Sequence, residues 1–499
     1  MNEDLMIMLK KFFLILFIFT VFLLVHSCGD SKKPGEDKPQ EDPTPPTDEV
    51  YAGIVNRSLY DEPETKNFEK YNFRILENPN STVFSFHKQV PEEDIGEAVN
   101  DAFIKRNRAA EDKYNITISS VYNENPGDIL QRNIAANDDI CDLAFINSSR
   151  VFGLAQIGGL TDFNSVNALR LGMPWWDQRI IEGLSVYDKI YTLTGDITTN
   201  DDVSALTILY NKELYKNLGY ENPYEIVSKG AWTMDKMAEM IKGVNRDLNG
   251  DGAIDENDQW GMASESIAMY YFFFGSGMHY IDKTPHGYEF TLDDVKVKSV
   301  IEKTYGLLTA DDSIYDLYKA IRGQTDNVYK TLEKMFREDR LLFNVRLVGD
   351  AMYLRDMASS FGFLPFPKYD EQQKEYYSWV TMYMDTLVTP NIISDPEKSA
   401  LITEALAFES MFTIREPFYE TLLNMKIARD DEDTQMLDLI LSCKAYDLDG
   451  VNQGSGIQSG IMDMMNNMLS QRNFTLASSW EKLKDKATGK LEKFLQSFE

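Results

Sequence analysis

The sequence predicts an α/β protein built from two or more lobes, and two observations support this. The chain has 499 residues, which is more than one ordinary hydrophobic core can organise. From Tyr71 onward, short apolar segments with strand character alternate with longer segments of helical character. Strands that are separated by helices are typical of a parallel sheet that helices cover on both faces. We therefore expect a folded α/β body that begins near Tyr71.

Three buried strands and the helices between them make up the first predicted sheet. The strands are expected at 72–76, 115–118 and 142–146, and the helices at 95–114 and 130–136. In such sheets ligands bind beyond the carboxyl ends of the strands. Those ends are 78–82 for the first strand and 147–150 for the third. Both are candidate parts of a binding site.

A second alternating series follows Asp196. Its strands are expected at 205–210 and 341–345, and Thr233 is a predicted helix N-cap. The segment 361–369 is rich in Pro and Gly and is expected to cross between lobes.

Charge and cysteine content exclude two classes of protein. Asp and Glu number 80 against 50 Lys and Arg, a formal net charge of -30. This charge repels phosphate backbones, so we expect no nucleic-acid partner. The three cysteines, Cys28, Cys141 and Cys443, are too few for a disulfide framework. We expect Cys141 and Cys443 to be free thiols, although the sequence leaves a bridge between them open.

The N-terminus predicts export and lipidation. Lys10 and Lys11 precede the apolar stretch 12–25, which is shorter than the roughly 20 residues that span a bilayer. The following Ser27-Cys28 resembles the lipobox of bacterial lipoproteins, in which the cysteine is acylated. We therefore expect a signal peptide at 1–27, a lipid on Cys28 and a location at the extracytoplasmic face of the cell membrane. A plain secretory signal is the alternative.

Residues 28–70 are expected to form a tether between this lipid and the folded body. The stretch 29–49 is rich in Pro, Asp, Glu and Lys and has almost no apolar residue. Such a segment cannot bury enough apolar surface to offset its ordering entropy, so we expect it to be disordered.

Several short stretches occur in the same order as in one known family. They are Asn100-Asp101-Ala102, Gly158-Gly159-Leu160-Thr161-Asp162, Pro174-Trp175-Trp176-Asp177, Tyr210-Asn211-Lys212-Glu213-Leu214, Trp232-Thr233-Met234-Asp235 and 361–369. With these stretches the chain, from about Tyr71 to at least Tyr446, resembles the family 1 extracellular solute-binding proteins. These are maltose-binding-protein-like lipoproteins that feed ABC importers.

The resemblance implies a two-lobed, type II periplasmic-binding-protein-like fold, with hinge strands joining the lobes around a ligand cleft. The N-lobe would comprise 71–195, with roughly 366–420 returning to it. The C-lobe would comprise 196–365, with roughly 421–499 completing it. The implied function is the capture of a small solute, usually a carbohydrate, and its delivery to ABC permease subunits. We expect a monomer without catalytic activity.

Candidate ligand contacts are hydrogen-bonding side chains at strand ends and aromatic rings, because sugars present hydroxyls and flat C–H surfaces. After the strands come Asn80, Ser81, Asn147, Ser148, Ser149 and Arg150; the aromatic candidates are Trp176, Tyr271 and Trp379. Asp196 and Arg346 adjoin apolar strands and could contact hydroxyls or pair with each other. The alternatives are turn formation for the Asn and Ser residues and core packing for the rings.

The segment 247–258 has the ligand spacing of a calcium loop. Oxygen-bearing side chains stand at loop positions 1, 3, 5, 9 and 12, a glycine stands at 6, and a backbone carbonyl would serve at 7. In order, the expected ligands are Asp247, Asn249, Asp251, Ala253, Asp255 and Asp258. We expect a structural Ca²⁺ here. A solvated acidic turn is the alternative.

Two rival functions remain open. A glycan-active hydrolase would need two carboxylates across a sugar cleft or an activated nucleophile. The chain has only four histidines, and no HExxH, GxSxG or Cys–His arrangement occurs in its sequence. A surface glycan-binding lipoprotein without a transporter would share the same cleft.

Overall fold

The computed structural model describes residues 56–499 except 79, 81–86, 266, 286, 311–312, 317–327, 425–430 and 452–455. Residues Asp48–Glu499 form one compact unit. Within the described part, no helix is both long enough and apolar enough to cross a membrane. The N-terminal 55 residues, and with them the predicted signal peptide, Cys28 and most of the tether, lie outside the described residues. The end of the expected tether is folded and packs on the N-lobe, where Arg57 pairs with Glu409 at 2.6 Å and the ring of Tyr60 lies 6.1 Å from that of Trp175. The expected boundary of the folded body near Tyr71 was therefore too late.

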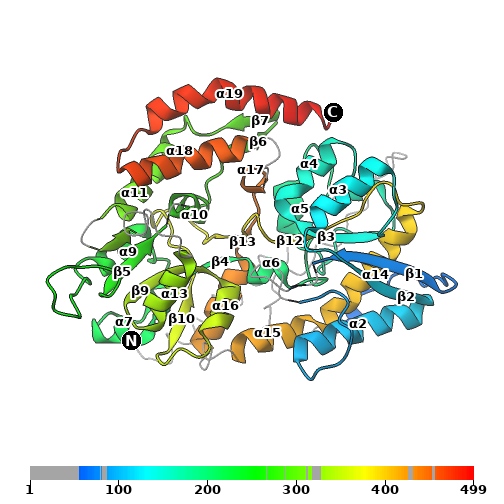
Figure 1. Ribbon diagram of the computed structural model, residues 1–499, viewed down its shortest axis with the longest axis horizontal. Coiled ribbons are helices and arrows are strands. Elements are labelled where there is room, and N and C mark those ends of the chain that lie inside the picture. The colour runs from blue at the N-terminus through cyan, green and yellow to red at the C-terminus, as the bar shows by residue number, and fades with distance from the viewer. Residues whose placement is uncertain are drawn as a thin grey trace, which may run out of the picture. The chain divides into compact units, whose positions relative to one another are not determined.

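The N-lobe contains a four-stranded sheet in the order β12-β3-β1-β2 (Figure 1). Strands β1 (Tyr71–Glu77), β2 (Ile116–Tyr122) and β3 (Leu143–Asn147) are parallel, and β12 (Asp385–Val388) runs antiparallel to β3. Helices α2 (Ala98–Tyr114) and α3 (Pro126–Ala136) connect the parallel strands. The three predicted strands and two predicted helices are therefore confirmed.

Both faces of this sheet are buried. Successive side chains of a strand point to opposite faces, and apolar side chains of both kinds occur on these strands. Phe73 and Ile75 belong to one hydrophobic cluster, and Leu76 belongs to the other. On β3, Phe145 and Ile146 divide between the two clusters in the same way. The second cluster, which contains Leu76 and Ile146, continues into the core of the C-lobe.

The C-lobe contains a five-stranded sheet in the order β10-β4-β9-β5-β8. Its strands are β4 (Leu206–Asn211), β5 (Trp260–Ser264), β8 (Ile314–Asp316), β9 (Leu341–Leu347) and β10 (Phe361–Leu364). Strand β4 is antiparallel to both of its neighbours, while β5 is parallel to β8 and β9. Both sheets are therefore mixed, whereas the alternation of strands and helices predicted parallel strands. The reason is that β4 and β12 each begin just after the chain has come over from the other lobe.

Helices cover the C-lobe sheet and complete both lobes. Those that follow β3 as far as β9 are α4 (Val151–Gln156), α5 (Gln178–Leu184), α6 (Asn200–Val203), α7 (Lys212–Asn217), α8 (Pro223–Ser228), α9 (Met234–Ile241), α10 (Ala268–Gly275), α11 (Val295–Leu308) and α13 (Val328–Arg337). Those that follow β12 are α14 (Pro396–Thr413), α15 (Arg415–Asn424), α16 (Asp431–Ser442), α17 (Leu448–Val451), α18 (Ile457–Gln471) and α19 (Leu476–Gln496). Thr233 caps α9 by accepting a hydrogen bond from the backbone N–H of Lys236, as predicted.

The position of strand β10 shows that one expectation about the segments that cross between the lobes was wrong. The segment 361–369 was expected to pass between lobes, but Phe361–Leu364 pairs with β4 inside the C-lobe sheet. The crossing comes later, where β11 (Ser378–Trp379) pairs with β13 (Lys444–Ala445) before the chain enters β12. Because two segments far apart in sequence pair there, the connection between the lobes has its own short sheet.

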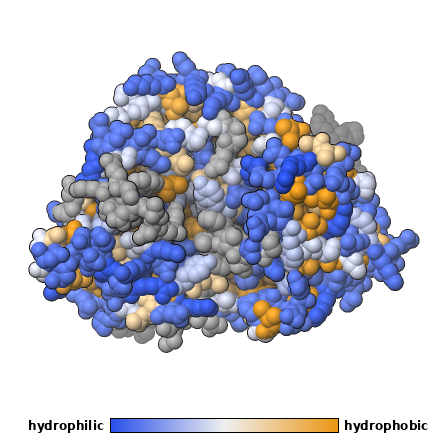
Figure 2. All heavy atoms as spheres, viewed as in Figure 1, coloured by the Kyte–Doolittle hydropathy of each residue, from blue (hydrophilic) through white to orange (hydrophobic). Residues whose placement is uncertain are grey.

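Cys141 and Cys443 are free thiols, as expected. Burial raises the pKa of both thiols to about 12. Figure 2 shows that hydrophilic residues cover most of the face in view, with apolar residues in small separate groups. This surface agrees with the strongly acidic composition.

Candidate functional site

A cavity of about 660 Å³ lies beside the end of strand β9 in the C-lobe. Its walls come from β9, the 3₁₀ helix Val348–Leu354 that follows it, α10, α13, α18 and the segment between β11 and β12. Most of the wall is apolar. The apolar lining residues are Leu206, Ile267, Val345, Leu347, Leu354 and Met462, and the polar and aromatic ones are Glu265, Tyr271, Lys330, Glu333, Arg346, Asp350, Tyr353, Thr381, Tyr383 and Asn466.

Charged side chains of both signs are buried in these walls. Arg346 is 7% exposed and Glu265 is 8% exposed. One carboxylate oxygen of Asp350 accepts a hydrogen bond of 3.2 Å from the backbone N–H of Leu347. Burial raises the pKa of Asp350, and the nearby guanidinium of Arg346 opposes this by favouring the carboxylate. Buried ionic groups inside an apolar wall give directional hydrogen bonding to whatever occupies the cavity.

Tyrosine rings and one amide add to this polar set. Tyr353 is 46% exposed and Tyr383 is 37% exposed, so both rings present a face to solvent beside the cavity. Tyr271 is partly buried, with its ring 6.1 Å from that of Trp379. The Oδ1 atom of Asn466 is buried and has no hydrogen-bond partner within the described part of the chain. A buried acceptor of this kind is costly unless a donor reaches it, which a bound hydroxyl would do.

The N-lobe reaches the cavity through hydrogen bonds at the end of β3. The Nδ2 group of Asn147 donates to the carbonyl of Tyr383 at 2.8 Å, and the hydroxyl of Ser148 donates to the carbonyl of Met382 at 2.6 Å. The backbone N–H of Ser149 donates to the same Met382 carbonyl at 3.2 Å. These three predicted residues therefore hold the segment that carries Tyr383, and Asn147 also caps the short 3₁₀ helix Ser148–Arg150.

The other strand-end candidates lie apart from this cavity. Asn80 is exposed, and its backbone N–H donates to the side chain of Asn78 in a turn. Ser81 lies outside the described residues. Arg150 pairs with Asp128 at the protein surface.

Two predicted tryptophans are core residues in the structure. Trp176 is 1% exposed, and its Nε1 donates to Glu404 at 2.9 Å. Trp379 is also 1% exposed and stacks on Phe274, with ring centroids 4.9 Å apart. Trp379 therefore supports Tyr271 from behind, and Tyr271 is the ring that lines the cavity.

Asp196 has a different partner from the one considered. It forms a two-bond ion pair with Arg415, at 2.7 and 2.9 Å, and not the alternative pair with Arg346. Arg346 instead lines the cavity near Asp350. Of the predicted ligand contacts, Arg346 and Tyr271 are the two that the structure brings into the cavity wall.

Eight polar or aromatic lining residues were missed from sequence: Glu265, Lys330, Glu333, Asp350, Tyr353, Thr381, Tyr383 and Asn466. The sequence indicated only Tyr383 in part, because this residue closely follows Trp379, which is one of the predicted ligand contacts. The others come from segments far apart in the chain, and no spacing rule connects them.

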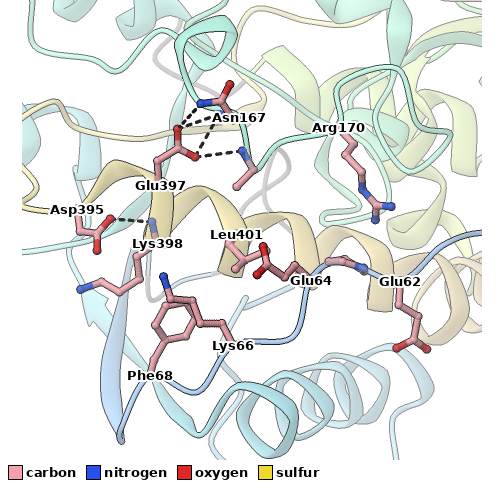
Figure 3. Close-up of a pocket in the computed structure, with 12 residues that line it drawn as sticks. Glu62, Glu64, Lys66, Phe68, Asn167, Arg170, Asp395, Glu397, Lys398 and Leu401 are labelled. Carbon is pink, nitrogen blue, oxygen red and sulfur yellow. Dashed lines mark hydrogen bonds between the residues drawn. The ribbon is translucent and has the colours of Figure 1, made fainter. Parts of the chain in front are cut away.

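A second cavity of about 330 Å³ lies on the N-lobe between the segment 62–68, the segment 167–170 and the first turns of α14 (Figure 3). The carboxylate of Glu397 points to Asn167 and accepts its backbone N–H at 2.9 Å. Asp395 caps α14 by accepting from the N–H of Lys398. Arg170 donates to Glu404 at 2.8 Å. Because these groups are engaged in holding the local chain, we assign no ligand to this cavity.

In the predicted calcium loop, backbone N–H groups donate hydrogen bonds to two of the carboxylates. Asp247 accepts from the N–H groups of Gly250 and Gly252, and Asp258 accepts from those of Leu248 and Asp255. Within the described residues, no three His, Cys, Asp or Glu side chains are grouped so as to hold a metal ion. Ile254, at position 8 of the loop, is 42% exposed.

The indole of Trp260 donates to the carbonyl of Asp255 at 2.7 Å, so Trp260 packs on the loop.

Comparisons with known proteins give matches among solved structures alone. No protein-family model matches the chain, and no curated protein matches it. A maltose/maltodextrin-binding domain from Bdellovibrio bacteriovorus, bound to maltotriose, has a TM-score of 0.52 and 14% identity, covering 84% of this chain and 100% of that one. An ABC substrate-binding protein from Listeria monocytogenes, in complex with cycloalternan, has a TM-score of 0.52 and 11% identity, covering 86% and 100%.

A sugar transporter protein from Rhizobium etli, in an open conformation, has a TM-score of 0.55 and 12% identity, covering 84% of this chain and 99% of that one. At these identities the likeness concerns the fold. The chain therefore has the two-lobed α/β fold of the family 1 solute-binding proteins.

Proposed function

We propose that this protein captures a carbohydrate in the cavity beside β9 and passes it to the permease subunits of an ABC importer. The observation that carries the proposal is the composition of the cavity wall. It combines exposed tyrosine rings, buried charges of both signs and an unpaired amide oxygen on a largely apolar surface. Sugars need such a surface, because their C–H faces pack on rings while their hydroxyls donate and accept hydrogen bonds.

The size of the cavity and the similar proteins support the same ligand class. A volume of about 660 Å³ falls within the range of ordinary small-molecule sites. The similar structures include proteins bound to maltotriose and to cycloalternan. We therefore place a saccharide of a few units first among candidate ligands for this chain.

Membrane attachment and the transporter partner belong to the same proposal. The signal at 1–27, the cysteine at Cys28 and the polar segment 29–49 would hold the binding unit at the extracytoplasmic face by an acyl chain. A monomer on such a tether could both collect solute and reach a permease.

A surface glycan-binding lipoprotein without a transporter is the second candidate. It would use the same cavity, and genes for permease subunits beside this one would favour the importer. A hydrolase is the third candidate, because Glu265, Glu333 and Asp350 line one cavity. Sugar release by the purified protein would favour it.

A thermal-shift screen tests the ligand class. Purified protein is heated with maltotriose, maltotetraose, monosaccharides, amino acids and short peptides. A true ligand at 100 times its dissociation constant stabilises the protein by about 2.7 kcal/mol. A shift with an oligosaccharide that is lost in Arg346→Ala supports the proposal. A flat response to every sugar with a shift from an amino acid or peptide contradicts it.

We further propose that the loop 247–258 binds a structural Ca²⁺. The support is the spacing of its oxygen ligands and the turn that brings Asp247 and Asp258 back onto the loop backbone. A carboxylate oxygen has two acceptor sites, so it can bind a cation while it accepts an N–H. The side chains would have to draw closer together around the ion.

A further inference from the structure

The last helix of the chain reaches from the C-lobe to the N-lobe. Helix α19 packs on α18 and on the C-lobe, where Trp480 contacts Phe290 with ring centroids 5.3 Å apart and Lys484 pairs with Asp293 at 2.5 Å. Its far end lies beside α4 of the N-lobe (Figure 1). There Phe494 and Phe498 are 1% and 2% exposed.

These two phenylalanines are buried against N-lobe side chains. The ring of Phe152, on α4, is 5.7 Å from that of Phe494 and 6.4 Å from that of Phe498. Phe498 also lies 5.6 Å from Tyr191, and its carbonyl accepts a hydrogen bond from the ammonium of Lys189. The hydrophobic core therefore runs without interruption from α19 into the N-lobe, as the shared cluster of buried residues indicates.

A hairpin of the C-lobe contacts the same part of the N-lobe. It consists of β6 (Ile281–Thr284) and β7 (Gly287–Phe290). The ammonium of Lys283 donates to the carbonyl of Glu182 at 2.5 Å and to the hydroxyl of Ser185 at 3.0 Å. The hydroxyl of Tyr288 accepts the backbone N–H of Tyr187 at 3.1 Å.

The N-lobe turn that receives both contacts is conformationally costly. Tyr187 and Asp188 have φ values of 48° and 40°, which lie in the left-handed region. A bulky residue such as tyrosine is rare there, and such a conformation persists where surrounding contacts hold it. The contacts with Tyr288 and the α19 end are the surrounding structure that holds this turn.

We propose that the end of α19 and the β6–β7 hairpin form an interlobe strap that restrains movement of the two lobes relative to each other. The strap consists of Phe494, Phe498, Lys283 and Tyr288 on the C-lobe side. It is separate in sequence from the crossing at β11 and β13, so it adds a further set of contacts between the lobes. A hinge with such added contacts permits less relative motion than one hinge alone.

Hydrogen exchange on the full-length protein tests the strap. The amides of Val380 and Thr381 report on the crossing, because they donate to Ala445 and Ser204. In Phe494→Ala/Phe498→Ala we expect exchange to rise about tenfold in peptides covering 185–191 and also in those covering 378–384. Leu483→Ala is the matched control. This side chain packs against α18 near Gly460, within the C-lobe, and its loss should affect α18 and α19 alone.

The result that overturns the proposal is a double variant whose faster exchange is confined to α18 and α19, as in the control. If the double variant does not fold, Lys283→Ala/Tyr288→Phe decides the matter. Lys283 is exposed and the tyrosine ring is kept, so the fold should survive. We expect about threefold faster exchange in 185–191 and 378–384. Unchanged exchange there would overturn the strap. None of these measurements needs a ligand, so the outcome is independent of the proposed function.

Discussion

The Nζ atom of Lys444 lies 2.5 Å from the Oδ1 atom of Asp202, and both side chains are buried. Lys444 also pairs with Asp201 and, at 3.3 Å, with Asp177. Asp177 caps α5 in the N-lobe, Asp201 and Asp202 belong to α6, and Lys444 belongs to β13. One ammonium group therefore holds three acidic side chains from two separate segments at the crossing between the lobes.

Replacing this lysine should destabilise the protein strongly. Lys444→Met removes the cation and leaves buried carboxylates uncompensated, which typically costs 3–5 kcal/mol, so we expect a loss of about 4 kcal/mol in the free energy of unfolding. Urea denaturation monitored by tryptophan fluorescence measures it. Lys229→Met is the control, because Lys229 forms an exposed pair with Glu225 and its loss should have no measurable effect. Equal stability of the two variants would contradict this account of the crossing.

The sequence was sufficient to predict the fold wherever local patterning decides the structure. The alternation through Phe73, Ile75 and Leu76 predicts a strand with two buried faces, and the structure has one. Strand direction was not predictable in the same way. The antiparallel placement of β4 and β12 depends on where the chain re-enters a lobe, which no local pattern encodes.

The candidate site was predicted less well, for a physical reason. A cavity wall is made by side chains that converge from distant segments. Asn466 and Tyr353 come from elements more than one hundred positions apart in chain order and meet at one cavity. Likewise Asp196 is paired with Arg415, 219 positions away, whereas the partner considered from the sequence was Arg346. Polarity at a strand end indicates that a side chain is available for contacts, but not which partner it finds.

Substitutions of two cavity residues should distinguish the contribution of hydrogen bonding to ligand affinity from that of ring contact. Arg346→Ala removes a buried donor, and Tyr383→Ala removes an exposed ring. We expect each to weaken binding of the saccharide found by thermal shift by about 10- to 100-fold, since a lost hydrogen bond or ring contact to a ligand typically costs 1–3 kcal/mol. Isothermal titration calorimetry measures this. Arg150→Ala is the control, because Arg150 pairs with Asp128 at the surface and should leave affinity unchanged. An unchanged dissociation constant in both test variants would move the ligand away from this cavity.

Calcium should raise the melting temperature if the loop 247–258 binds it. We expect the rise to be reversed by EGTA and absent in Asp247→Ala, because Asp247 stands at the first ligand position. Magnesium should have a smaller effect, since it prefers six ligands in a stricter geometry. Asp293→Ala is an acidic control outside the loop, paired with Lys484, and should keep the calcium response. A melting temperature that is insensitive to millimolar calcium in the unmodified protein would favour the solvated acidic turn.

Acidification should destabilise the protein partly through His87. Burial lowers the pKa of this imidazole to about 4, and its Nδ1 lies 3.0 Å from the hydroxyl of Thr199. An unfolded histidine titrates near 6.5, so between pH 6.5 and pH 4 the unfolded chain binds a proton that the folded chain does not. The neutral form therefore contributes stability that is complete above pH 6.5 and is lost as the pH falls towards 4.

The full contribution of this imidazole to the free energy of unfolding is on the order of 3 kcal/mol. The variant His87→Gln should remove its pH dependence while keeping a hydrogen-bond partner for the hydroxyl of Thr199. The measurement is the free energy of unfolding by urea at pH 7 and at pH 4.5, in both proteins. Other groups also gain protons on acidification, and burial raises the pKa of one of them, Glu77, but these groups are common to both proteins. The difference between the two pH dependences therefore reports on His87. We expect the unmodified protein to lose more stability on acidification than the variant, and parallel losses would show that the imidazole is already solvated in the folded state.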